Sequence, residues 1–152
     1  MTIDDLSRID RAIDIKAPPE RVFRALTTNA ELSAWFQVSI EGEISPGNEV
    51  WMTTHHPKNK GLRFPVQIEE ITPPVRFVWK WHPGADGMNQ LDEPLTTVTF
   101  TLEPTAEGTR LHVAETGFNE ISLQHRAKAF SDNSGGWTQV IVWIQQYAEA
   151  QG

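Results

Sequence analysis

Glu115 is the residue of this chain whose type and position best suit chemistry. In the predicted strand that contains it, Glu115 shares one face with Leu111 and Val113. Burial on an apolar face would raise the pKa of its carboxyl group, which could then act as an acid or base, or anchor the polar end of a ligand. Two alternatives stay open, namely a salt bridge with Arg11 or Arg63, or a strand end that lies in solvent.

Aromatic side chains are the second group with binding potential. The chain has six tryptophans and seven phenylalanines but one tyrosine. Rings without a hydroxyl group suit either an apolar core or the wall of an apolar pocket, and both interpretations stay open. Together with Glu115, the residues that we expect to line a cavity are Phe77, Trp79, Trp81, Phe100, Val113, Trp137 and Ile141.

The histidines and the possible nucleophiles do not indicate a metal site or a catalytic site. His55 and His56 are adjacent on a predicted strand, so their side chains point to opposite faces. The chain has no Gly-x-Ser-x-Gly elbow and no glycine-rich phosphate-binding motif. Ser134 lies near His125 and Asp132 in sequence, but we interpret Asp132 and Ser134 as helix-cap residues rather than as parts of a triad. We therefore expect no metal and no cofactor, and we name no catalytic residue.

The elements that position these groups follow from periodicity and turn residues. Two short helices are predicted after the first strand, one beginning near Pro18–Pro19 and one over 29–35. Strands are predicted near 9–16, 37–44, 48–56, 62–72, 75–82, 95–104 and 109–117. Strands grouped apart from helices are typical of an α+β domain.

The chain ends in a predicted amphipathic helix over 137–149, with a weaker helical segment over 120–130 before it. Its buried face would contain Trp137, Val140, Ile141, Ile144 and Ala148. We expect the cap of this helix among Asp132, Asn133 and Ser134. Gly135 and Gly136 would allow another backbone or a ligand to approach closely.

Composition sets further bounds. The length of 152 residues favours one domain, which we place at 9–152 after a tail of residues 1–8. A net charge of −7 argues against nucleic acid as a partner, and the lack of cysteine excludes disulfides and thiolate chemistry. No apolar run approaches the ~20 residues that span a bilayer, so we expect no membrane insertion. The first residues do not resemble a signal peptide, and we expect a cytoplasmic protein.

Several segments, taken in order, resemble the START-like superfamily (SRPBCC), which includes the birch-pollen allergen. Those segments are IDIKAPPERVF at 13–23, LSAWF at 32–36, EEITPP at 69–74, FVW at 77–79, ETGF at 115–118 and GW at 136–137. Within the superfamily, the chain is similar to the group related to the C-terminal domain of the activator of the 90-kDa heat-shock-protein ATPase. This resemblance implies a helix-grip fold, in which a curved seven-stranded antiparallel sheet wraps around the long C-terminal helix over an apolar cavity.

Three functions are compatible with this resemblance. The first is noncatalytic binding of a small hydrophobic molecule of lipid, polyketide or aromatic type, with Glu115 as a polar anchor. The second is an enzyme similar to the aromatase/cyclases, with Glu115 as the acid or base. The third is a cochaperone-like interaction module with a protein partner or a homodimer.

Overall fold

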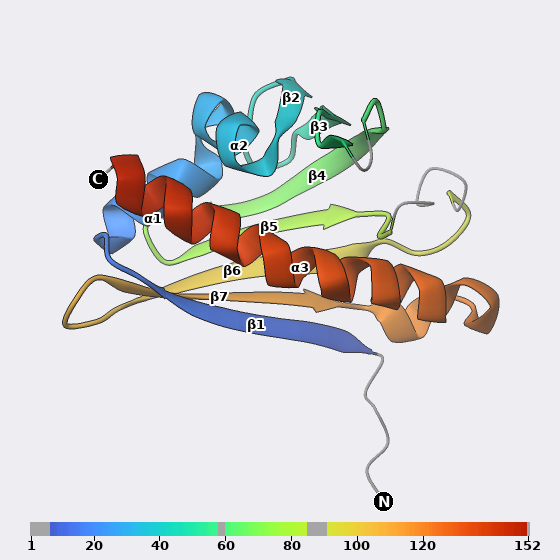
Figure 1. Cartoon of the computed structure of the whole chain (residues 1–152). Coiled ribbons are helices and arrows are strands. Elements are labelled where there is room, and N and C mark those ends of the chain that lie inside the picture. The colour runs from blue at the N-terminus through green and yellow to red at the C-terminus, as the bar shows by residue number, and fades with distance from the viewer. Residues whose placement is uncertain (1–6, 58–59, 85–90, 152) are drawn as a thin grey trace, which may run out of the picture.

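The computed structural model describes residues 7–57, 60–84 and 91–151 (Figure 1). The elements, in order, are β1 (Arg8–Ile15), α1 (Pro19–Thr27), α2 (Asn29–Phe36), β2 (Val38–Glu41), β3 (Glu49–Thr54), β4 (Arg63–Thr72), β5 (Arg76–Trp81), β6 (Thr96–Pro104), β7 (Thr109–Thr116), the 3-10 helix η3 (Phe118–Glu120) and α3 (Leu123–Gln151). The predicted α+β class and the order of its elements are confirmed.

The seven strands form one antiparallel sheet in the order β1-β7-β6-β5-β4-β3-β2. Strands β2 to β7 are neighbours in sequence and in space, as in an antiparallel meander. The first strand pairs with the last, with Ile9 opposite Glu115. This arrangement confirms the predicted seven-stranded helix-grip sheet.

Helix α3 crosses one face of the sheet, and α1 and α2 lie near its C-terminal end (Figure 1). The predicted apolar stripe of α3 is confirmed, because Trp137, Val140, Ile141, Ile144 and Ala148 are all buried. These side chains pack against the alternating inward residues of the strands, which form the core. Within the described ranges, no helix is both long and apolar enough to cross a bilayer.

The start of α3 corrects a prediction. The helix begins at Leu123 and is continuous through 132–136, so Asp132, Asn133 and Ser134 lie inside it and cap nothing. Each of the three makes a tertiary or helical contact instead, Asp132 with Lys128, Asn133 with Glu115 and Ser134 with Arg11. Those contacts, with the burial of Trp137, hold the helix through the two glycines that local propensity disfavours.

Candidate functional site

A cavity of about 900 Å³ lies between α3 and the ends of strands β2 to β5. On the helix, the lining residues Asp132, Gly136, Gln139 and Trp143 follow the i, i+4, i+7, i+11 spacing of one face. Across from that face the lining residues come from the end of α2, from β2 to β5 and from their connections. The volume falls within the roughly 300–1,000 Å³ that small-molecule sites usually have.

Aromatic rings form much of the cavity wall. The lining rings are Phe36, Phe64, Trp81, Trp137 and Trp143. The ring centroid of Trp81 lies 6.3 Å from that of Phe36, 5.9 Å from Phe64 and 6.1 Å from Trp137. Because Phe36, Phe64 and Trp137 all contact Trp81, the orientations of these four rings are set by packing before any ligand arrives.

Glu115 lies directly behind two of these rings and is fully buried. Its Oε2 atom accepts hydrogen bonds from Trp81 Nε1 at 2.7 Å and from Thr96 Oγ1 at 2.5 Å. Its Oε1 atom accepts one from Trp137 Nε1 at 2.8 Å. The amide nitrogen of Asn133 donates to both oxygens, at 2.9 and 3.0 Å. The carboxylate is therefore surrounded by hydrogen-bond donors from β5, β6 and α3.

Burial raises the pKa of Glu115, while the hydrogen bonds from Thr96, Trp81, Trp137 and Asn133 act in the opposite direction. Neither alternative considered for Glu115 occurs. Arg11 instead contacts Ser134 on α3, and Arg63 pairs with Glu41 on β2.

Asn133 joins the carboxylate to the segment that follows β5. Its Oδ1 atom accepts a hydrogen bond from the backbone N–H of Gly84 at 2.9 Å, while its Nδ2 atom donates to Glu115. With the amide oxygen and nitrogen both engaged, the orientation of this side chain is fixed. Asn133 also lines the cavity, so its contacts help to shape the cavity wall.

Of the eight residues predicted to line a cavity, Trp81 and Trp137 line this one. The other six are buried in the core, namely Phe77, Trp79, Phe100, Val113, Glu115 and Ile141. The reason is that α3 packs on the centre of the sheet, where the ring centroid of Trp137 lies 5.8 Å from that of Phe100 and 6.5 Å from that of Trp79. The open space lies to one side, toward β2, β3 and β4.

Three lining rings were absent from the sequence-based set. Phe36 belongs to the LSAWF segment at 32–36, in which the neighbouring Trp35 holds α2 to α1 through a hydrogen bond from its Nε1 to the Ala25 carbonyl at 2.8 Å. Trp143 lies beside the apolar stripe of α3, and its ring packs 5.5 Å from that of His56. Its spacing of seven residues from Gly136 was the available signal. Phe64 gave no such signal.

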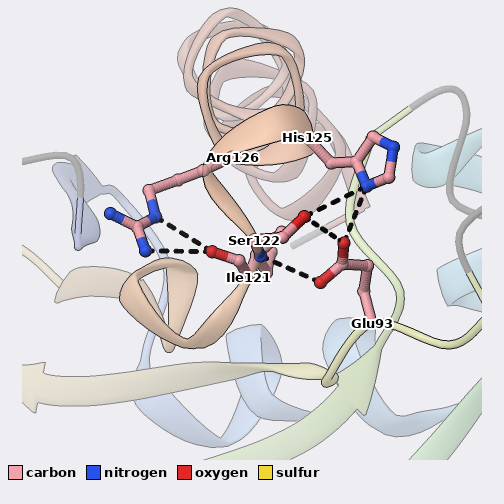
Figure 2. A network of polar contacts seen from close by, with 5 residues as sticks. All are labelled: Glu93, Ile121, Ser122, His125 and Arg126. Carbon is pink, nitrogen blue, oxygen red and sulfur yellow. Dashed lines mark hydrogen bonds and ion pairs between the residues drawn. The ribbon is translucent and has the colours of Figure 1, made fainter.

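A separate polar cluster holds the beginning of α3 (Figure 2). The carboxylate of Glu93 accepts hydrogen bonds from the Ser122 backbone N–H at 2.9 Å and hydroxyl at 2.5 Å, and contacts His125 Nδ1 at 2.7 Å. The Ser122 contacts, followed by that of His125, lower the pKa of Glu93 to about 2. The carbonyl of Ser122 accepts the first helical N–H bonds, from His125 and Arg126.

This cluster is a helix cap and not a catalytic triad. Glu93 accepts the Ser122 N–H as the acidic residue of a capping box does, although it lies 29 residues away in sequence. The Ser122 hydroxyl, at 3.4 Å, and the Glu93 carboxylate, at 2.7 Å, both contact the same nitrogen of His125, Nδ1, whereas a triad uses one ring nitrogen for the serine and the other for the acid. In the described part of the chain, no three histidine or acidic side chains are grouped as metal ligands.

Solved structures share this fold. Protein MLL2253 from Mesorhizobium loti is 21% identical, with a TM-score of 0.77 over 95% of this chain and 98% of that one. A protein from Arthrobacter aurescens is 16% identical, with a TM-score of 0.78 over 97% of this chain and 90% of that one. The Aha1 dimer from Colwellia psychrerythraea is 19% identical, with a TM-score of 0.70 over 93% and 96%. At these identities the similarity shows the fold alone.

Sequence comparison is more specific about the family. No curated protein matches the chain significantly. The family model described as Activator of Hsp90 ATPase homolog 1-like protein matches residues 16–149. That match covers the first helix, the cavity and nearly all of α3, and it agrees with the START-like fold of the neighbours. The chain therefore belongs to the family of Activator of Hsp90 ATPase homolog 1-like proteins.

Proposed function

We propose that this protein binds a small hydrophobic molecule in the cavity between the sheet and α3. The observation that carries the proposal is a cavity of about 900 Å³ with five aromatic rings in its wall. Rings that are already packed against each other lose little freedom when a ligand arrives, so more of the contact energy remains as affinity.

In this proposal Glu115 positions the cavity wall and does not touch the ligand. Its two oxygens hold the indole N–H groups of Trp81 and Trp137, which both line the cavity. The sequence suggested a polar anchor for the ligand, but Glu115 is fully buried behind those rings. Positioning of the two tryptophans is the role that its contacts support.

The aromatase/cyclase-like alternative would require the same carboxylate to reach a substrate. Four residues occupy the two oxygens of Glu115 with hydrogen bonds, and Glu115 is not among the lining residues. Proton transfer needs hydrogen-bond reach between the acid or base and the reacting atom. We therefore favour binding over catalysis by Glu115.

A titration monitored by tryptophan fluorescence tests the proposal. Uncharged hydrophobic compounds should produce a saturable change in the wild-type protein. Trp143→Ala removes a ring from the cavity wall and should weaken binding about tenfold, since loss of a well-packed ring contact costs on the order of 1–2 kcal/mol.

Trp51→Ala is the matched control. Trp51 lies on β3 beneath the guanidinium of Arg63, 4.1 Å from its ring centroid, and does not line the cavity. This variant should bind as the wild type does. Failure of every compound to give saturable binding, or equal weakening in both variants, would overturn the proposal.

A homodimer is a second candidate property, because the Colwellia psychrerythraea neighbour is described as an Aha1 dimer. Light scattering after gel filtration distinguishes the masses, since one chain has a mass of 17.2 kDa. A single species of one-chain mass across the micromolar range would exclude a stable dimer.

The family name also suggests a cochaperone role. Stimulation of a purified 90-kDa heat-shock-protein ATPase by this protein tests that role.

A further inference from the structure

Gly135 and Gly136 form an unusual part of the cavity wall. Both lie inside α3, where glycine is the least favourable residue apart from proline. Both are exposed and line the cavity. A Cβ atom added at either position would meet no atom of the described residues within 4 Å. Packing within the described part of the chain therefore gives no reason for glycine at these two positions.

Gly84 is a position where the fold itself requires glycine. Its φ angle is +86°, and a Cβ atom there would lie 3.2 Å from the Cα atom of Ala129 on α3. Neither condition holds at Gly135 or Gly136, whose backbone is helical and whose surroundings are open. Two adjacent glycines lie in this helix at the cavity wall, although glycine disfavours helix formation. A ligand that lies against the bare backbone explains them best.

The rest of the cavity wall indicates the shape of that molecule. Five of its lining residues carry flat aromatic rings, among them Phe36, Phe64 and Trp81. The bare backbone at the two glycines offers another surface without protruding side chains. Flat surfaces suit a rigid ring system, because stacked rings make close contact over their whole faces and lose little conformational entropy on binding.

Charge in the cavity wall indicates the second property of the ligand. Among the lining residues that the structure describes there is no lysine and no arginine. The one acidic lining residue, Asp132, is already 2.9 Å from Lys128 Nζ. Two histidines also line the cavity: burial lowers the pKa of His82, which favours its neutral form, and the ring of His56 packs against Trp143. An anionic group would thus be desolvated with no lysine or arginine among the described lining residues to pair with it, which is unfavourable.

We propose that the cavity takes an uncharged, flat ring compound that lies against the α3 backbone at Gly135 and Gly136. This inference rests on the proposed binding function and narrows its ligand class. Gln37, Thr54 and Gln139 also line the cavity and supply amide and hydroxyl groups for a hydroxyl or carbonyl substituent on the ring. Flexible fatty acids, which are anionic at pH 7, fit neither property.

Four probes separate shape from charge. Calorimetric titration of the wild type would use 2-naphthol (flat, uncharged), 2-naphthoate (flat, anionic), decan-1-ol (flexible, uncharged) and decanoate (flexible, anionic). We expect 2-naphthol to bind at least tenfold more tightly than each of the other three. Equal or tighter binding of any of the other three would overturn the inference and leave the proposed function standing. Binding of none of the four would overturn both.

Substitutions test the position of the ligand. Gly135→Leu and Gly136→Leu place a strong helix former in the space above the backbone, and each should weaken 2-naphthol binding at least tenfold while circular dichroism shows an intact fold. Gln146→Leu adds the same side chain at an exposed position of α3 that does not line the cavity, and should bind as the wild type does. Wild-type affinity in both glycine variants would overturn the inference.

Discussion

The carboxylate of Glu115 accepts a hydrogen bond from Trp137 Nε1 at 2.8 Å, so a fully buried acidic residue holds a ring of the cavity wall. Trp81, from the other side of the cavity, donates to the second oxygen of the same carboxylate at 2.7 Å. Indole nitrogens can only donate hydrogen bonds. Their geometry therefore depends on an acceptor at position 115, and this dependence makes Glu115 the most informative residue to change.

Glu115→Gln should destabilise the protein although the two side chains have the same shape. The amide keeps one acceptor oxygen but replaces the other by a donating NH₂ group, which then faces donors such as Trp137 or Asn133. A buried donor without an acceptor costs about 1–3 kcal/mol. Urea denaturation at pH 7 should show a loss of that size in the free energy of unfolding.

Glu107→Gln is the control for this experiment, because Glu107 is exposed in the turn between β6 and β7. Its effect should lie within about 0.5 kcal/mol of zero. A Glu115→Gln variant as stable as the wild type would mean that the two tryptophans do not need a side chain that accepts hydrogen bonds at both of its terminal atoms.

Asn133→Asp should destabilise the same cluster by charge rather than by hydrogen bonding. The new carboxylate would take the place of an amide nitrogen that lies 2.9 and 3.0 Å from the two oxygens of Glu115. Two carboxylates at that distance repel each other, and one must take up a proton. We expect a loss of about 2–4 kcal/mol at pH 7.

Part of that loss should return at pH 5, where protonation of one carboxyl group removes the repulsion. Asn119→Asp, on an exposed residue of η3, makes the same chemical change without a buried neighbour and should have little effect at either pH. A pH-independent loss in Asn133→Asp would point to the lost amide contacts instead of charge.

Glu93 should contribute to stability only above a defined pH. Its folded pKa is lowered to about 2 from an ordinary value of 4.5, chiefly by the hydrogen bonds from Ser122. A lowered folded pKa means that the unfolded chain binds the extra proton between these values, so stability is present above pH 4.5 and is lost as the pH falls toward 2.

Glu93→Gln should therefore be less stable than the wild type at pH 7, with a gap that narrows from pH 4.5 downward and closes near pH 2. Urea denaturation across this range measures the gap. Glu120→Gln, an exposed position in η3, should follow the wild-type curve. A gap of constant size at all pH values would show that the charge of Glu93 is not what holds the start of α3.

The sequence predicted the sheet and the face on which Glu115 lies, because alternation along a strand is a local signal. It did not predict the donors around that residue. Trp81 and Asn133 are 34 and 18 residues away from Glu115, and only the assembled fold brings them to its oxygens.

The start of α3 and the position of the cavity were missed for similar reasons. The local pattern favoured a cap at Asp132, Asn133 or Ser134, whereas the helix begins after Ser122, held by Glu93 from 29 residues away. Periodicity also indicates which side chains face inward but not where two packed elements separate. Trp79 and Trp81 share a face of β5, yet only Trp81 reaches the cavity.

Gly135→Ala and Gly136→Ala should each raise stability, which is the opposite of the usual effect of a substitution. Alanine is better than glycine in a helix by about 0.5–1 kcal/mol, and the added methyl group meets no described atom within 4 Å. The double variant should therefore gain about 1–2 kcal/mol and melt about 3–6 °C higher. Gly84→Ala should do the reverse, because its φ of +86° and the nearby Ala129 backbone both oppose a side chain. Thermal melts without ligand compare all four variants with the wild type. A loss of stability in the double variant would show that the apo protein itself needs glycine there, and would remove the reason to assign that space to a ligand.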